Sequence, residues 1–261
     1  MGARMITVKI EGMAALQASL GNNARQIPFA AKNALNRCAE TTRLTLYGTF
    51  RAVFDMPTKQ TMDSLRIVYA KKNSLSAEVK VKDIGLPKSH AEPGDNGEVS
   101  MASVLEHQFI GGRRRRKRIE RSFENAGLIR SGEYLAPGPD ARLDQFGNIS
   151  RGQVQQIYAA LGLFFDRYQN ATQSKRSQRN AVAAGRLFWS NGKAATRAGK
   201  LRRGLWGADA NGKRLKLILV VIPSANYKRR VDMPAITEKV VAKTWDRWFQ
   251  QELAKALATA R

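Results

Sequence analysis

The sequence is poor in the residues that build metal centres and covalent cross-links. Its 261 residues include one cysteine, Cys38, and two histidines. A single thiol cannot form an intramolecular disulfide or a multi-cysteine zinc or iron–sulfur site, and two imidazoles cannot make a histidine-rich metal centre. We therefore expect no cofactor and no bound metal.

Long apolar runs are also missing. No stretch of about 18 apolar residues occurs, and the first ten residues show no basic segment followed by an apolar one. We expect neither a membrane span nor a secretory signal, and a protein that is made in the cytoplasm. Hydrophobic residues still make up 43% of the chain, which is enough to build a folded core.

Acidic residues are scarce relative to basic ones. Against 45 Lys and Arg stand 21 Asp and Glu, which gives a net charge of +24. Residues 1–111 hold 14 basic and 10 acidic residues, whereas residues 112–261 hold 31 and 11. Self-repulsion of this size favours an anionic partner, either nucleic acid or acidic neighbouring subunits. The second part of the chain is therefore predicted to face the anion.

Three basic stretches in this second part are the candidate partner-facing segments. They are an unbroken run at 113–118, a stretch at 175–203 without acidic residues, and a stretch that ends at 228–230. One such run is ordinarily a solvated surface, but three in one part of a chain favour a binding role. The candidate residues are Arg113, Arg114, Arg115, Arg116, Lys117, Arg118, Lys175, Arg176, Arg202, Arg203, Lys228, Arg229 and Arg230.

Apolar periodicity predicts two long helices. Residues 27–54 repeat apolar side chains every three or four positions, with Pro28 in the first turn and Cys38 packed on the apolar face. A second pattern begins after Asp232 and runs to about Thr259. The apolar stripe of this second helix consists of Val241, Trp245, Trp248, Phe249, Leu253 and Leu257.

The remaining patterns predict short strands and helices. Alternation indicates an antiparallel hairpin at 65–70 and 75–82. Other strands are expected at 4–10, 186–190, 204–207 and 215–222, and other helices at 13–20, 101–109, 119–126 and 151–168. This order predicts a single α+β domain over residues 1–261, with two long helices packed on an antiparallel sheet. A mainly helical and loop insertion at about 92–169 and a basic loop at about 170–203 interrupt it.

Catalytic motifs are absent from the sequence. It has no Gly-Lys-Ser/Thr phosphate loop and no GxGxxG, HExxH or GxSxG pattern. Glu106 and His107 are neighbours that would point to different sides of a helix, and Asp140 and Asp144 lie in a Pro/Gly-rich segment where aspartate usually caps turns. We predict that the protein is not an enzyme, since a nuclease would need converging acidic metal ligands.

Motifs that read nucleic-acid sequence are absent as well. The chain has no zinc finger, no aromatic RNP-like pattern and no helix-turn-helix. Gly111 and Gly112 directly precede the run at 113–118, and flexible backbone followed by dense positive charge suits phosphate contact. Any nucleic-acid binding is therefore expected to be independent of sequence.

Several segments resemble virion proteins of tailed bacteriophages. They are residues 27–37, 109–117, 132–138, 143–152 and 227–230. Together they are similar to the minor tail protein Z or tail completion group, which is related to the small HK97-type neck and tail proteins. Those small relatives fold as a helix packed on an antiparallel sheet, and this chain departs from them by its insertion.

The resemblance implies a structural subunit of the virion, a tail completion or neck protein that forms a ring at the head–tail junction. Its expected partners are other copies of itself, portal or connector proteins, tail tube or terminator proteins, and double-stranded DNA bound without sequence preference. The basic stretches would either line a channel for DNA or contact acidic faces of neighbouring proteins. The alternative from composition alone is a sequence-nonspecific basic nucleic-acid-binding protein.

Overall fold

The computed structural model describes residues 26–82, 101–172, 174–177, 179, 186–193, 195–196, 199–209, 211 and 213–259. The strand and helix expected at 4–10 and 13–20 lie outside these residues. The described residues form two compact units. Unit 1 comprises those up to Gly112 and from Tyr227 onward, and unit 2 runs from Arg113 to Asn226. The fold is α+β, and unit 2 is inserted into the sequence of unit 1.

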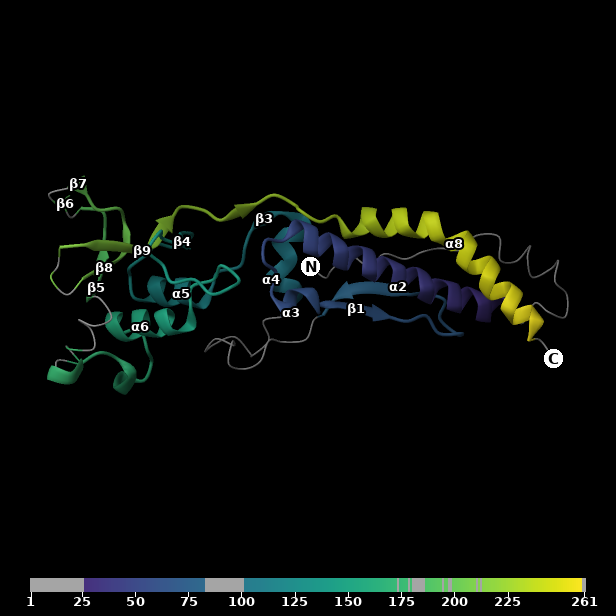
Figure 1. The fold of residues 1–261 in the computed structure, drawn as a ribbon, viewed down its shortest axis with the longest axis horizontal. Coiled ribbons are helices and arrows are strands. Elements are labelled where there is room, and N and C mark those ends of the chain that lie inside the picture. Colours follow the sequence, from purple (N-terminus) through teal and green to yellow (C-terminus); the bar gives the residue numbers. More distant parts are fainter. Residues whose placement is uncertain are drawn as a thin grey trace. The chain divides into compact units, whose positions relative to one another are not determined.

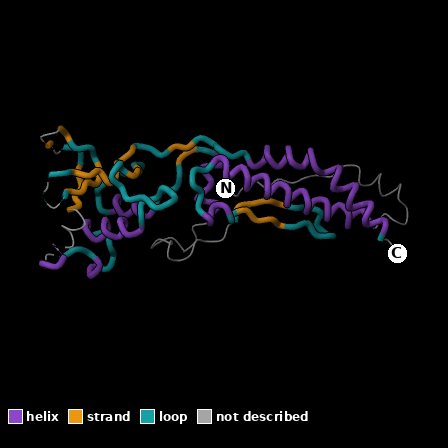
Figure 2. Tube along the Cα trace, viewed as in Figure 1, coloured by secondary structure: helices purple, strands orange, loops and turns teal. Residues whose placement is uncertain are grey.

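Unit 1 is built on two long helices that lie side by side, as Figures 1 and 2 show. The first of them also packs against a two-stranded antiparallel hairpin. The long helices and the hairpin agree with the sequence-based prediction. The elements of unit 1 are α2 (Ile27–Val53), α3 (Lys59–Met62), β1 (Leu65–Val68), β2 (Glu78–Val81), α4 (Met101–Ile110) and α8 (Met233–Ala258).

The core of unit 1 forms where α2 meets the hairpin. Leu65 of β1 lies opposite Val81 of β2 in the register, so both side chains point to the same face of the hairpin. This face packs against Leu46 and Phe50 of α2, both fully buried. Leu105 of α4 belongs to the same cluster. The antiparallel hairpin that the alternation predicts is therefore confirmed.

Helix α8 meets α2 through small and polar side chains as well as through part of the expected apolar stripe. The buried residues of α8 are Thr237, Thr244, Glu252 and Ala256. The hydroxyl oxygen of Thr244 lies 3.6 Å from the sulfur of Cys38, and Glu252 pairs with Arg37 at 2.8 Å. Trp245 is only half-buried and stacks on Phe249. Val241 and Trp248 of the expected stripe also face α2, because Val241 lines a small cavity with Cys38 and the Trp248 ring lies 4.9 Å from the Arg37 guanidinium. The sequence periodicity thus placed the helix correctly and identified part of its contact face.

Unit 2 contains a four-stranded antiparallel sheet in the order β4-β9-β8-β5. Phe123 of α5 and Ile157 of α6 are fully buried and share a core with Leu135, Leu205 and Leu219 of the sheet. The elements of unit 2 are α5 (Arg118–Asn125), β4 (Tyr134–Pro137), α6 (Arg151–Leu161), η3 (Arg167–Gln169), β5 (Arg186–Ser190), β6 (Ala195–Thr196), β7 (Gly199–Lys200), β8 (Gly204–Ala208) and β9 (Leu215–Ile222). Two further strands, β3 (Gly112–Arg113) and β10 (Asn226–Tyr227), each include one residue of either unit. Among them, β3 pairs with β10 and β6 with β7.

Strand β4 changes the expected domain organisation. The Pro/Gly-rich segment that contains Asp140 follows directly after Tyr134–Pro137, which pairs with β9 as an edge strand, a position where proline is tolerated. Because β4 and β9 belong to one sheet, the inserted unit runs to Asn226. The expected insertion at 92–169 is therefore too short, and the expected basic loop at 170–203 contains strands of unit 2.

Helix α6 ends earlier than its apolar pattern indicated. The expected helix ran to residue 168, whereas α6 stops at Leu161. Gly162 follows with φ of 67°, a left-handed conformation that favours glycine and ends helices. Residues 163–168 therefore lie beyond the helix, and the aromatic side chains of this segment take different surroundings from those expected.

Candidate anion-binding surface

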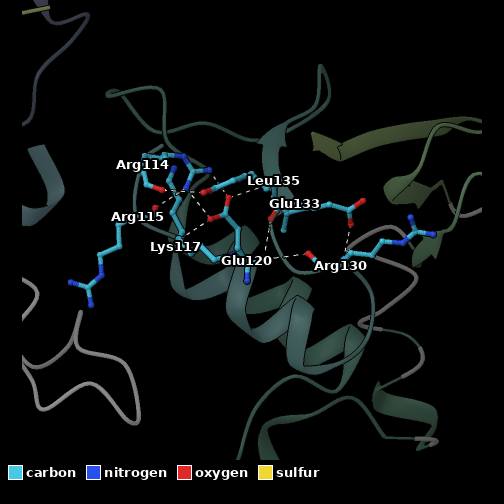
Figure 3. A network of polar contacts seen from close by, with 9 residues as sticks. Arg114, Arg115, Lys117, Glu120, Arg130, Glu133 and Leu135 are labelled. Carbon is cyan, nitrogen blue, oxygen red and sulfur yellow. Dashed lines mark hydrogen bonds and ion pairs between the residues drawn. The ribbon is translucent and has the colours of Figure 1, made fainter. Parts of the chain in front are cut away.

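The six basic residues at 113–118 do not act alike in the structure. The side chains of Arg114 and Arg116 turn inward and are 10% and 21% exposed. The other four residues of the run are exposed, and Figure 3 shows that the side chain of Arg115 points away from Glu120. Helix α5 begins at Arg118, and in the residues before it exposed and inward-facing side chains alternate, as in an extended chain. The charge pattern hides this alternation because all six residues are cations.

Glu120 in the first turn of α5 is the anchor for the inward-facing arginines. Its side chain is fully buried, and its carboxylate forms an ion pair with Arg114. One carboxylate oxygen accepts a hydrogen bond from the Leu135 amide at 2.9 Å, and the other accepts one from the Lys117 amide at 2.7 Å (Figure 3). The carboxylate thereby provides an acceptor for one backbone N–H group at the N-terminus of α5 and for one in the edge strand β4.

The environment of Glu120 keeps its carboxylate charged. Burial alone would raise the pKa of the group, but the hydrogen bonds from Arg114 and from the amides of Leu135 and Lys117 outweigh burial. The net result is a pKa below the ordinary value for glutamate. Arg114 is held by a second contact, because its guanidinium lies 4.8 Å from the centre of the Tyr134 ring.

Two more ion pairs hold arginines of the candidate set inside unit 2. Arg116 pairs with Glu124, one turn after Glu120 in α5, and also donates to the carbonyl of Glu133 at 3.0 Å. Arg203, which precedes β8, pairs with the carboxylate of Glu133. Partial burial would raise the pKa of Glu133, but hydrogen bonds from the Arg130 amide and from Arg203 lower it on balance. Arg114, Arg116 and Arg203 are therefore structural residues.

The other candidate cations are on the surface. Lys175, Arg176 and Arg202 of unit 2 are exposed. The basic stretch at 228–230 belongs to unit 1, where Arg229 pairs with Asp232 at 2.7 Å and Arg230 donates to the carbonyl of Val53. The structure therefore assigns the three basic stretches to two different units.

Unit 2 carries far more positive charge than its own carboxylates can balance. Residues 113–226 hold 23 Lys and Arg but only seven Asp and Glu, which gives a net charge of +16. Glu120, Glu124 and Glu133 pair with the three inward-facing arginines. The other four carboxylates accept hydrogen bonds from backbone amides, and they belong to Asp140, Asp144, Asp166 and Asp209. All seven are thus engaged within the unit, which leaves its surplus of positive charge without matching carboxylates of its own.

Asp140, Asp144 and His107 make structural contacts. Asp140 accepts a hydrogen bond from the Leu217 amide at 2.9 Å, and Asp144 accepts two from the turn that follows it. The His107 ring packs against Tyr227 with centroids 4.6 Å apart. Among the described residues, no three His, Cys, Asp or Glu side chains are grouped to hold a metal ion.

A small cavity in unit 1 offers no room for a substrate. It lies between α2, α8 and β2 and has a volume of about 20 Å³. Its lining includes Cys38 and Thr42, and the buried hydroxyl of Thr42 has no hydrogen-bond partner in the described part of the chain. This volume fits about one water molecule. Burial raises the pKa of the Cys38 thiol despite its bond to Thr244 and the nearby charge of Arg247, so the thiol is protonated at neutral pH.

Sequence reasoning missed two aromatic residues of unit 2 that lie on the surface. Phe165 and Tyr168 fall within the helix expected at 151–168, but their side chains are 102% and 97% exposed. The sequence signal that locates them is Gly162, which ends α6 before both residues.

The candidate surface therefore consists of exposed cations and exposed aromatic rings. Within the described ranges, no helix has the length and apolar character needed to span a membrane. The chain as a whole has no match among protein-family models, curated proteins or solved structures.

Proposed function

We propose that this protein is a structural subunit of a tailed-phage virion, a tail completion or neck ring protein at the head–tail junction. In this role it contacts other copies of itself, neighbouring virion proteins and the double-stranded DNA that passes through the junction. The sequence segments that resemble the minor tail protein Z or tail completion group support this proposal. The arrangement of unit 1, a long helix packed on an antiparallel hairpin, is consistent with the fold that the resemblance implies.

One observation carries the proposed contact with DNA or with acidic neighbours. Unit 2 has a net charge of +16, and its seven carboxylates all bond within the unit. Exposed cations without local counter-charges bind a polyanion by releasing its condensed counterions. Contacts of this kind go to phosphates and carry no sequence information, which suits a protein that must accept any DNA passing through it.

The virion role is tested in a phage that encodes this chain. Deletion of the gene should leave filled heads and tails that fail to join, and expression of the wild-type chain should restore infectivity. Labelling of the chain in purified particles should place it at the head–tail junction. Particles that lack the chain and infect normally without its gene would refute the virion role.

The second candidate function, a sequence-nonspecific nucleic-acid-binding protein, is favoured by the same charge surplus. It differs in that the chain would bind duplex DNA outside any particle and without other virion proteins. Absence from virions together with salt-dependent DNA binding by the free protein would support this second function over the first.

The DNA contact itself is tested by salt titration of duplex binding. Alanine at Arg113, Arg118 and Arg202, three exposed cations of unit 2, should reduce the slope of log affinity against log salt by about 0.9 for each lost phosphate contact. Three exposed cations of unit 1 serve as the matched control, with glutamine at Arg66, Lys71 and Lys72. An equal change of slope in both triple variants would show that unit 2 is not the contact surface.

A further inference from the structure

Residues 162–179 form a surface segment of unit 2, called here the aromatic lobe. It begins at Gly162, directly after α6, and its described residues are 162–172, 174–177 and 179. Phe165 is 102% exposed and Tyr168 is 97% exposed. These two fully exposed rings lie three residues apart in the sequence, and exposed apolar groups that gather on a surface mark interaction sites.

The exposed rings stand on an anchored backbone. Asn170 both accepts a hydrogen bond from the Phe164 amide at 3.1 Å and donates one to its carbonyl at 3.2 Å. Asp166 accepts from the Tyr168 amide at 3.0 Å and thereby caps the short helix η3. The Ala171 amide bonds to the carbonyl of Ala159 in α6 at 2.9 Å. The backbone that carries both rings is therefore pre-organised rather than a loose strand.

Phe164, the residue before Phe165, has its ring packed against α6 instead of fully exposed. The Phe164 ring packs against Tyr158 of α6 with centroids 5.4 Å apart, while the next side chain is fully outside. One aromatic residue thus joins the lobe to the helix. Phe165 and Tyr168 contribute nothing to the core of unit 2, so they are available for a partner.

Cations accompany the rings in the same segment. Lys175, Arg176 and Arg179 are exposed and make no ion pair with the described carboxylates. The single acidic residue of the lobe, Asp166, is occupied by the cap of η3. A hydrogen bond from the Thr172 amide to the Ser177 hydroxyl at 2.9 Å folds the basic end of the lobe back on itself.

We propose that the aromatic lobe is a binding site for single-stranded nucleic acid. Unpaired bases stack on Phe165 and Tyr168, and the phosphates that follow contact Lys175, Arg176 and Arg179. Proteins that bind single strands without sequence preference combine these two features, because every base has a face to stack and every nucleotide carries a phosphate. A duplex hides its base faces, so the rings add affinity for single strands only.

Charge complementarity favours nucleic acid over a membrane surface or an apolar protein pocket. The surplus of +16 is distributed over the whole of unit 2, with exposed cations on α5, β5, β7 and β9 as well as on the lobe. A flexible polyanion can follow cations from one element to the next, whereas a flat membrane meets one side of a unit. The proposal is independent of the virion role, in which duplex DNA is held through its phosphates.

The test compares binding of a labelled oligothymidylate and a duplex by the full-length protein. The wild type should prefer the single strand. Alanine at both Phe165 and Tyr168 should weaken single-strand binding by about tenfold or more and leave duplex binding unchanged. Alanine at Lys175, Arg176 and Arg179 should instead lower the salt slope for the single strand by about 2. Unchanged thermal melting confirms that the variants fold, as expected for exposed residues.

The control replaces an exposed Phe and Tyr of unit 1, Phe29 and Tyr69, by alanine and should bind both ligands as the wild type does. The proposal is overturned if the wild type binds duplex and single strand equally, or if the lobe variant keeps its single-strand affinity. A lobe variant that retains single-strand affinity but no longer enters virions would assign the rings to a protein neighbour. If that lobe variant retains both its single-strand affinity and salt-dependent duplex binding, the single-strand site is refuted and the proposed contact of unit 2 with duplex DNA is not.

Discussion

Glu120 is the residue on which the local structure of unit 2 depends most. Its side chain is fully buried and forms an ion pair with Arg114, and its carboxylate accepts hydrogen bonds from the amides of Lys117 and Leu135. Removing one partner of a buried pair leaves the other charge without compensation, which is more damaging than replacing the whole pair. The basic run at 113–118 therefore has two parts, since Arg114 and Arg116 hold the fold through ion pairs and the other four side chains are exposed.

Glutamine at Glu120 should destabilise unit 2 by about 3 kcal/mol, because Arg114 then lacks its counter-charge in a buried position. Hydrogen exchange of the β9 amides under native conditions reports the opening free energy of this unit. The matched control is Glu124→Gln in the next turn of α5, where the ion pair with Arg116 is partly exposed and the loss should stay below about 1 kcal/mol. Equal effects of both substitutions would contradict the assigned role of Glu120.

The lowered pKa values of Glu120 and Glu133 predict a loss of stability in acid. Both groups have pKa values below the ordinary value in the folded protein, so each contributes stability above the unfolded pKa of about 4.3. That contribution is lost as the pH falls through the folded pKa values. Thermal melting between neutral pH and pH 3 should show this fall. The Glu120→Gln/Glu133→Gln variant should have a lower melting temperature than the wild type at neutral pH, and this temperature should depend less on pH. The Glu238→Gln variant, with its substitution on α8, should show the same pH dependence as the wild type.

At the scale of elements, glycine allows the edge strand β4 to approach β9. The Gly138 amide donates to the Ile218 carbonyl at 2.8 Å, directly after β4 ends. A Cβ atom at Gly138 would meet the backbone carbonyl oxygen of Leu217 at 2.2 Å. This contact is too short for any other residue, and the carbonyl belongs to a central strand that cannot easily move.

Alanine at Gly138 should therefore destabilise unit 2 by about 1–3 kcal/mol, the usual range for overpacking. The opposite sign is expected for Gly48→Ala on the exposed side of α2, where a Cβ atom meets nothing within 4 Å and helix propensity gains about 0.5–1 kcal/mol. Urea unfolding of each variant gives both numbers. Stabilisation by Gly138→Ala would show that β4 does not lie against β9 as described.

Whole-molecule organisation follows from where the chain enters and leaves unit 2. The Arg114 amide donates to the Ala225 carbonyl at 3.2 Å, so the two ends of this unit lie together. The unit also has its own core around Phe123, Ile157 and Leu219. An insertion with adjacent ends and a separate core is able to fold alone.

Residues 113–226 expressed alone should thus fold and unfold cooperatively. Circular dichroism should show a single thermal transition, and the fragment should keep the salt-dependent DNA binding assigned to unit 2. The remaining chain, with residues 112 and 227 joined by a short glycine linker, should retain its helical signal and lose most of that binding. A fragment without a cooperative transition would mean that unit 2 requires unit 1.

The sequence alone determined the elements whose patterns are local. Periodicity over residues 27–53 and 233–258 is long enough to specify helices, and alternation around Leu65 and Val81 is enough to specify a hairpin face. The distribution of charge is likewise a property of sequence, because each side chain carries its charge into any fold.

The tertiary structure decided everything that depends on partners distant in the chain. β4 pairs with β9 about 80 residues later, and this pairing moved the end of the inserted unit. The ion pairs with Glu120, Glu124 and Glu133 separated structural arginines from surface ones, which a run of identical charges could not do. Local sequence patterns indicate which secondary structure and which degree of burial a residue favours. The residues that it actually contacts depend on the packing of the whole unit.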